Sequence, residues 1–199
     1  MATMDPDRRS IRLKGYDYSG HGAYFVTLCA HRRRCFFGTI MEETVRLNAI
    51  GQIVQEEWLR TAEIRSSIVL SDFVVMPNHL HGIIVIMPDT RATHRVAFEA
   101  ERATHRVAPT QRPKGPAADS IGAILTQFKS MATKRANALN GTPGADLWQR
   151  NYYEHIIRDE DQLGRIREYI VNNPRQWAMD RDHPDRRQSH SSMDTPWLG

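Results

Sequence analysis

The chain has 199 residues, of which 40% are hydrophobic and 25% are charged, enough apolar residues for one domain with a core of its own. No apolar run approaches the ~20 residues of a membrane span, which argues against an integral membrane protein. The cysteines Cys29 and Cys35 form no CxxC pair, and the opening MATMDPDRRS does not resemble a signal peptide, so we expect a reduced, cytoplasmic protein.

Positive charge is concentrated near the N-terminus. The net charge is +4, and seven Lys or Arg residues fall within the first 34 positions against three acids. This balance is typical of a protein with a polyanionic partner, but also of an ordinary solvated basic surface, and composition does not separate the two. We expect residues 1–20 to form a basic arm in front of the folded domain.

The first predicted elements are a strand, a loop and a helix. Residues 24–30, YFVTLCA, are aromatic and β-branched and favour a strand, and the basic, aromatic sequence HRRRCFFG at 31–38 predicts a binding loop after it. Between residues 47 and 64, apolar side chains recur at helical spacing. This pattern predicts an amphipathic helix that covers one face of a sheet.

Two β-rich runs follow, at 67–77 and 79–88, and they are separated only by the turn-forming pair Pro77 and Asn78. We expect adjacent antiparallel strands. Residues 88–118 then change character, because the heptapeptide RATHRVA occurs twice and a Pro-rich stretch follows. A single short duplication does not build a solenoid, so we interpret this segment as an inserted, mostly disordered loop.

The second half of the chain predicts helix, strand and helix, at residues 120–139, 147–159 and 160–174, with Pro174 stopping the last helix. The polar residues 178–199 predict a flexible tail. The whole order is strand, helix, strand, strand, helix, strand, helix. It predicts one α+β domain over residues 21–177, with a ferredoxin-like or RRM-like antiparallel sheet, a fold that hosts many functions.

Two histidines, His79 and His81, stand one residue apart directly after Pro77 and Asn78. Residues i and i+2 of a strand project from the same face, so both imidazoles point the same way at one strand end. Imidazoles placed like this are able to share a metal ion, but two polar residues on the solvent face of a sheet show the same pattern. The motif alone leaves both interpretations open.

A second polar set lies on the last predicted helix. Tyr169 and Asn173 are four residues apart and share a helix face with Arg165, next to an apolar stripe. At this boundary between core and solvent, a side chain is held rigidly and still reaches a substrate. Ordinary boundary packing explains Tyr169 equally well, and Asn173 is also a normal helix-end residue before Pro174.

Several stretches of the sequence resemble those of a known protein family. The stretches RLKGYDYSGHGAYFVTLCAH, MPNHLHGIIV, SIGAILTQFKS, WQRNYYEHIIRDEDQL and EYIVNNP together resemble the single-tyrosine HUH transposases, and among them the REP-associated tyrosine transposases of bacteria. The resemblance extends over about residues 8–177, apart from the insert. It implies a fold of the HUH endonuclease type, and each motif is specific only in combination with the others.

The resemblance implies a role for each site residue. His79 and His81 correspond to the metal-binding histidines of the family, and Asn173 corresponds to its third protein ligand. The ion implied is Mg²⁺ or Mn²⁺. Tyr169 corresponds to the nucleophile, which attacks a DNA phosphodiester and leaves a 5′-phosphotyrosine and a free 3′-hydroxyl. Tyr152 and Tyr153 fall in strand framework of the family, so we rank them below Tyr169.

The substrate that the resemblance implies is single-stranded DNA with a REP-like hairpin. Cations on phosphates and rings on unpaired bases fit that target, and the residues expected to bind it are Arg12, Lys14, Tyr16, Arg32, Arg33, Arg34, Lys129 and Arg165. A homodimer is possible, because relatives are both monomeric and dimeric. Two alternatives stay open: a protein that binds hairpin DNA without cutting it, and a metal-dependent hydrolase in which the tyrosine is structural.

Overall fold

The structure is a computed structural model and describes residues 21–87 and 119–185. The predicted basic arm, the insert at 88–118 and residues 186–199 of the predicted tail lie outside this range. Arg12, Lys14 and Tyr16 are outside it as well. Within the described part of the chain, no helix is both long and apolar enough to cross a membrane.

The elements follow one another in the order expected, with a short hairpin added. Their bounds are β1 Gly22–Cys29, η1 His31–Arg33, β2 Gly38–Met41, β3 Thr44–Leu47, α1 Ala49–Glu63, β4 Ile68–Val75, β5 His79–Ile86, α3 Ile121–Asn140, β6 Tyr153–Ile157, α4 Glu160–Asn172 and η2 Trp177–Met179. Each long helix begins at a side-chain cap that accepts a backbone N–H hydrogen bond, namely Asn48, Ser120 and Asp159.

Four strands form the main sheet in the order β4-β5-β1-β6, and every neighbouring pair is antiparallel. With α1 after the first strand and α3 before the last, this is the ferredoxin-like connectivity. The predicted α+β fold is confirmed. Strands β5 and β1 occupy the centre, so residues at the start of β5 and the end of β1 face each other across the ladder, as Thr27 and His81 do.

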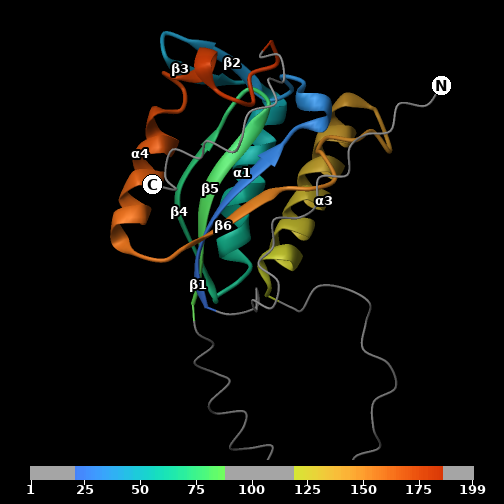
Figure 1. Cartoon of the computed structure of the whole chain (residues 1–199). Helices are drawn as coiled ribbons and strands as arrows, with labels where there is room; N and C mark the ends of the chain where they lie inside the picture. Colours follow the sequence, from blue (N-terminus) through green and yellow to red (C-terminus); the bar gives the residue numbers. More distant parts are fainter. Residues whose placement is uncertain (1–20, 88–118, 186–199) are drawn as a thin grey trace, which may run out of the picture.

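The two faces of the sheet carry different layers (Figure 1). Helices α1 and α3 cover one face, where the larger core contains Tyr24, Trp58, Leu80, Ile84, Leu125 and Phe128. Helix α4 covers the other face, where a smaller core contains Phe25, Ile83, Ile166 and Ile170. Alternation along β5 therefore places Leu80 towards α1 and α3, and His79 and His81 towards α4.

Close packing of α1 on the sheet depends on a glycine in β5. A Cβ on Gly82 would lie 2.4 Å from Cζ2 of Trp58, which is too close for two carbon atoms. The indole of Trp58 is fully buried against this position. Gly82 therefore lets α1 approach the strand that carries both histidines.

The hairpin of β2 and β3 was not predicted. Its strands have four residues each, and the two residues at its turn, Glu42 and Glu43, have left-handed backbone with φ of 50° and 60°. Such turns are normally marked by Asn or Gly, so two glutamates give no turn signal in the sequence. The strand expected at 147–159 is also shorter, because only Tyr153–Ile157 forms a continuous ladder with β1, whereas Trp148 forms an isolated bridge to Ala30.

The structure also differs from the flexible tail expected at residues 178–199. Residues 178–185 are described, and Asp180 and Asp182 are buried among them. The physical reason is a set of hydrogen bonds and an ion pair to Asn173, at the end of α4, and to Arg33 and Asn78, which are far away in the sequence. These contacts hold the segment after η2 against the end of the sheet.

Candidate active site

The two histidines begin strand β5, directly after a short turn. The Met76 N–H closes the turn by donating to the carbonyl of His79 at 2.8 Å, and the Ala30 N–H, directly after β1, donates to the carbonyl of Asn78 at 2.8 Å. Both imidazoles are 0% exposed, and their ring centroids are 4.4 Å apart. They are therefore not polar residues on a solvent-facing side, the alternative that the sequence left open.

In each imidazole, Nδ1 is engaged by a neighbouring side chain. Nδ1 of His81 lies 2.8 Å from the hydroxyl of Thr27, its partner across the β1–β5 ladder. Nδ1 of His79 lies 2.8 Å from Oδ1 of Asn78. The Nε2 atom of His79 is buried and has no hydrogen-bond partner among the described residues.

Tyr169 reaches the histidines from α4. Its hydroxyl lies 3.2 Å from Nε2 of His81, and its ring packs edge-on against Phe25 at 6.2 Å between centroids. The sequence interval between the two residues is 88 positions, and the fold closes it because α4 packs on the face of β5 that carries the histidines. Burial, followed by the negative charge of Asp180, raises the pKa of the Tyr169 phenol far above its usual value.

Asn173 lies one helical turn beyond Tyr169 and is also buried. Its Nδ2 donates to Oδ2 of Asp180 at 2.7 Å, whereas its Oδ1 has no hydrogen-bond partner among the described residues. The backbone N–H of Asp182 donates to the other oxygen of Asp180 at 2.6 Å. Asn173 and the segment after η2 are thus joined through one buried carboxylate.

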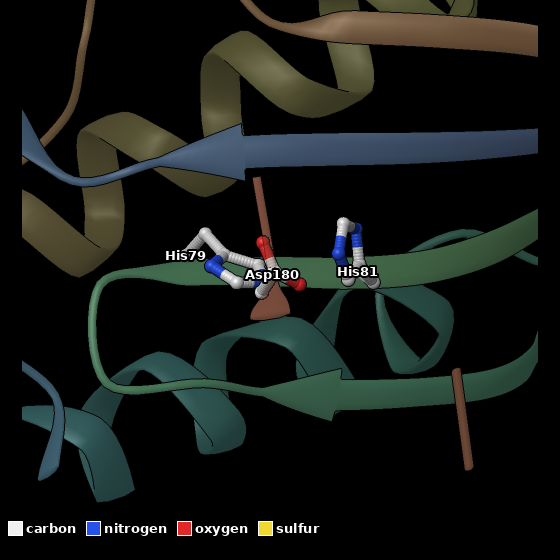
Figure 2. A group of neighbouring side chains, drawn as sticks. All are labelled: His79, His81 and Asp180. Carbon is white, nitrogen blue, oxygen red and sulfur yellow. The ribbon is translucent and has the colours of Figure 1, made fainter. Parts of the chain in front are cut away.

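His79, His81 and Asp180 form a cluster that was not fully predicted. One possible ligand atom from each lies within 4.8 Å of those of the other two, and all three residues are buried. Figure 2 shows the two rings projecting from β5, with the Asp180 carboxylate close to them. Asp180 comes from the expected tail, where no periodicity or motif marks it in the sequence.

The environment of the two rings favours their neutral forms. Burial lowers the pKa of His79, although the nearby carboxylates of Asp182 and Asp180 partly oppose this effect. Burial, then the adjacent His79 and the positive charge of Arg181, lower the pKa of His81 well below its usual value. A neutral imidazole has one nitrogen with a free lone pair, which is the form that binds a metal ion.

These atoms fit a divalent cation. A buried nitrogen and a buried amide oxygen without partners, on His79 and Asn173, are the kind of groups that a bound cation satisfies. The carboxylate of Asp180 adds an anionic oxygen, and a set of imidazole and oxygen donors suits Mn²⁺ and, less strongly, Mg²⁺.

The residues expected to bind DNA fall into two groups. Arg32, Arg34 and Arg165 are exposed and face solvent. Arg33 and Lys129 are instead engaged within the protein: Arg33 pairs with Asp182 at 3.0 Å, and the Lys129 ammonium donates to the carbonyls of Gln149 at 2.6 Å and Arg150 at 2.9 Å.

Arg181 is a further cation that the sequence did not indicate. Its guanidinium lies 5.5 Å from the ring centroid of Tyr153, on the same face of the sheet as Tyr169. Its positive charge also lowers the pKa of His81, after the effects of burial and of His79. The structure therefore places one Arg beside the site, from a segment expected to be a tail.

Comparison with known proteins gives two informative results. No family model matches the sequence. An uncharacterized protein of Haemophilus influenzae is 39% identical over 178 residues, which cover 89% of this chain and 94% of that protein. The structure of a REP-associated tyrosine transposase bound to a REP hairpin superposes with a TM-score of 0.54 at 17% identity, over 85% of this chain and 76% of the other.

The identity to the Haemophilus protein extends over nearly the whole of both chains, whereas the likeness to the transposase concerns the fold. The resemblance to REP-associated tyrosine transposases that the sequence motifs indicated is confirmed at that level. This chain belongs to the same family as the Haemophilus influenzae protein, and its fold is that of a REP-associated tyrosine transposase.

Proposed function

We propose that this protein is a tyrosine transposase that cuts and rejoins single-stranded DNA next to a hairpin, with Tyr169 as its nucleophile. The observation that carries the proposal is the distance of 3.2 Å between the Tyr169 hydroxyl and Nε2 of His81, beside the ring of His79. A phenol and two imidazoles from distant parts of one chain converge on one buried site. All three groups come from a single chain, so the proposed site does not require a second copy.

Tyr169 is suited to attack a phosphodiester. Its oxygen would form a bond to phosphorus while the bond to the 3′-oxygen breaks, giving a 5′-phosphotyrosine and a 3′-hydroxyl that takes up a proton. The covalent intermediate keeps the energy of the broken bond, so rejoining needs no nucleotide cofactor. Burial raises the pKa of the phenol and so favours the protonated hydroxyl, which Nε2 of His81 orients as long as that nitrogen holds no ion.

The residues that would hold a divalent ion are His79, His81 and Asn173, with Asp180 as an additional oxygen ligand. When bound, Mg²⁺ or Mn²⁺ would neutralise charge on the non-bridging oxygens of the scissile phosphate. The protein itself supplies a site closed to water, because both rings and the amide are fully or almost fully buried. Phe25 stacks on His81 at 5.4 Å between centroids and holds that ring in place.

DNA is the partner that best fits the exposed charge. We propose that Arg32, Arg34 and Arg165 contact phosphates, together with Arg12 and Lys14 of the N-terminal arm, and that Tyr16 stacks on an unpaired base. The guanidinium of Arg34 also lies 4.9 Å from the ring centroid of Phe36, which presents a cation and a ring side by side. This combination favours unpaired nucleotides, whose bases stack on rings while their phosphates attract cations. The substrate class follows the REP hairpin bound by the structural neighbour.

The proposal is tested with a labelled hairpin oligonucleotide that carries a single-stranded flank, run on a denaturing gel with Mn²⁺ or Mg²⁺. We expect a protein–DNA adduct that resists denaturation, requires the ion and disappears in Tyr169→Phe. Tyr153→Phe is the matched control, because its ring also packs edge-on against Phe25 and the resemblance does not assign it as the nucleophile. Binding without an adduct would indicate a hairpin-binding protein, and cutting without an adduct a metal-dependent hydrolase.

A further inference from the structure

Asn78 lies at the turn between β4 and β5, directly before His79, and its side chain is completely buried. Its amide makes three hydrogen bonds. Nδ2 donates to the carbonyl of Arg33 at 3.0 Å and to the carbonyl of Asp182 at 2.7 Å, and Oδ1 lies 2.8 Å from Nδ1 of His79. Asn78 therefore joins the loop after β1, the segment after η2 and a site histidine.

The chemistry of these partners fixes the orientation of the amide. Backbone carbonyls only accept hydrogen bonds, so the NH₂ group of Asn78 must face Arg33 and Asp182. The oxygen is then the atom that faces His79. Because an amide oxygen cannot donate, the hydrogen of this bond must belong to Nδ1 of the imidazole. In a neutral ring, the second nitrogen, Nε2, is consequently the one with the open lone pair.

We propose that Asn78 is a positioning residue that sets the orientation and tautomer of His79, so that Nε2 is presented to a divalent cation. This inference rests on the proposed metal site. Nε2 of His79 is buried and has no hydrogen-bond partner among the described residues, as the inference requires. Groups that hold the far nitrogen of a metal-binding histidine are known to fix its tautomer and raise its affinity.

The tautomer of His81 is not fixed in the same way. Its Nδ1 faces the hydroxyl of Thr27, and a hydroxyl is able to donate or accept, so this contact permits either tautomer. Only the amide of Asn78, oriented by two carbonyls, dictates which nitrogen carries the hydrogen. The assignment therefore distinguishes the two histidines, and it is testable one ring at a time.

The direct test is the tautomer of His79 in the full-length protein labelled with ¹⁵N at histidine. Long-range ¹H–¹⁵N correlation spectra separate a ring nitrogen that bears hydrogen from one that does not, and the signals of His79 are identified by their loss in His79→Gln. Without added metal, we expect hydrogen on Nδ1. Hydrogen on Nε2, or an equal mixture of the two tautomers, would overturn the inference. This test needs no substitution at Asn78.

The second test is Asn78→Leu, which keeps the number and branching of side-chain heavy atoms and removes all three hydrogen bonds. We expect the His79 ring to lose its preference for hydrogen on Nδ1, and affinity for Mn²⁺, measured from the EPR signal of the free ion, to fall about 10- to 100-fold. Thr61→Val is the matched control. It also removes a buried hydrogen bond to a backbone carbonyl, from Thr61 to Glu57 at 3.0 Å, but on the opposite face of the sheet.

A folded Asn78→Leu protein with wild-type Mn²⁺ affinity would contradict the inference. If this variant does not fold, the tautomer of His79 in the wild-type protein decides whether the inference holds. The outcome is separable from that of the proposed function. Hydrogen on Nδ1 together with Mn²⁺ binding but no DNA adduct would support the role of Asn78 and reject strand transfer. A DNA adduct formed by a protein whose His79 carries hydrogen on Nε2 would support strand transfer and reject the role of Asn78.

Discussion

Arg33 was expected to bind DNA, but in the structure it pairs with a residue of the protein itself. Its replacement is therefore predicted to lower the stability of the fold. Its Nη2 lies 3.0 Å from Oδ1 of Asp182, and its Nη1 donates to the carbonyl of Arg181 at 3.1 Å. The Asp182 side chain is 4% exposed and the Arg33 side chain 22% exposed. Arg33→Gln would remove the cation and leave a buried carboxylate with a weaker neighbour, Nε of Arg181 at 3.7 Å.

The size of the effect follows from this geometry. Removing one member of a fully buried ion pair costs about 3–5 kcal/mol, because the remaining charge stays buried without compensation. Arg33 is partly exposed and Arg181 remains nearby, so we expect a smaller loss in the free energy of unfolding, about 2–3 kcal/mol. For a chain of this size the thermal midpoint would fall by about 4–12 °C.

The assay is thermal unfolding followed by circular dichroism, with urea unfolding as a second measurement. Arg32→Gln is the matched control, since both residues have left-handed backbone, with φ of 53° and 55°, and Arg32 makes no ion pair within the described residues. We expect this control to stay within about 0.5 kcal/mol of the wild type. Equal stability of the two variants would refute the assignment of Arg33 to the fold.

Three further predictions concern packing, pH and DNA. Gly82→Ala places a Cβ 2.4 Å from Cζ2 of Trp58 and should lower the free energy of unfolding by about 1–3 kcal/mol in urea; an unchanged value would contradict the packing. Burial lowers the pKa of His81 in the folded protein below the usual value of 6.5. As the pH falls below 6.5, His81 is therefore protonated in the unfolded chain before it is protonated in the folded protein. Stability should then fall by up to about 1.4 kcal/mol per pH unit, and His81→Gln should flatten the curve; a curve as steep as that of the wild type would reject this cause. Replacing Arg32 and Arg34 with Gln should weaken binding to hairpin DNA and reduce its log–log salt slope by up to about 1.8, whereas an unaltered slope would exclude this loop from the interface.

The sheet and the main helices were predictable because local pattern and long-range packing agree. β1 and β5 alternate residues between two buried faces, and all three long helices have apolar stripes and capping residues. The proximity of Tyr169 to the histidines was a hypothesis from the resemblance. The structure brings these groups together because α4 packs on the face of β5 that His79 and His81 share.

Other parts of the site were not predictable, because their signals are not local. Asp180 and Asp182 belong to a polar stretch without apolar periodicity, and what buries them is a set of contacts to Arg33, Asn78 and Asn173. Nothing in the sequence near Arg33 distinguishes it from the exposed Arg32. Hydrogen-bond partners at separations such as the 104 residues between Asn78 and Asp182 follow only from the three-dimensional fold.

The most direct test of the central claim is to identify the residue that carries DNA. The adduct formed with a hairpin oligonucleotide and Mn²⁺ is digested with nuclease and trypsin, and the peptides are sequenced by mass spectrometry. The account predicts a nucleotide linked through its 5′-phosphate to Tyr169, in the tryptic peptide of residues 168–175. A nucleotide on Tyr152 or Tyr153, in the peptide of residues 151–158, or cleaved DNA without any modified peptide would contradict it.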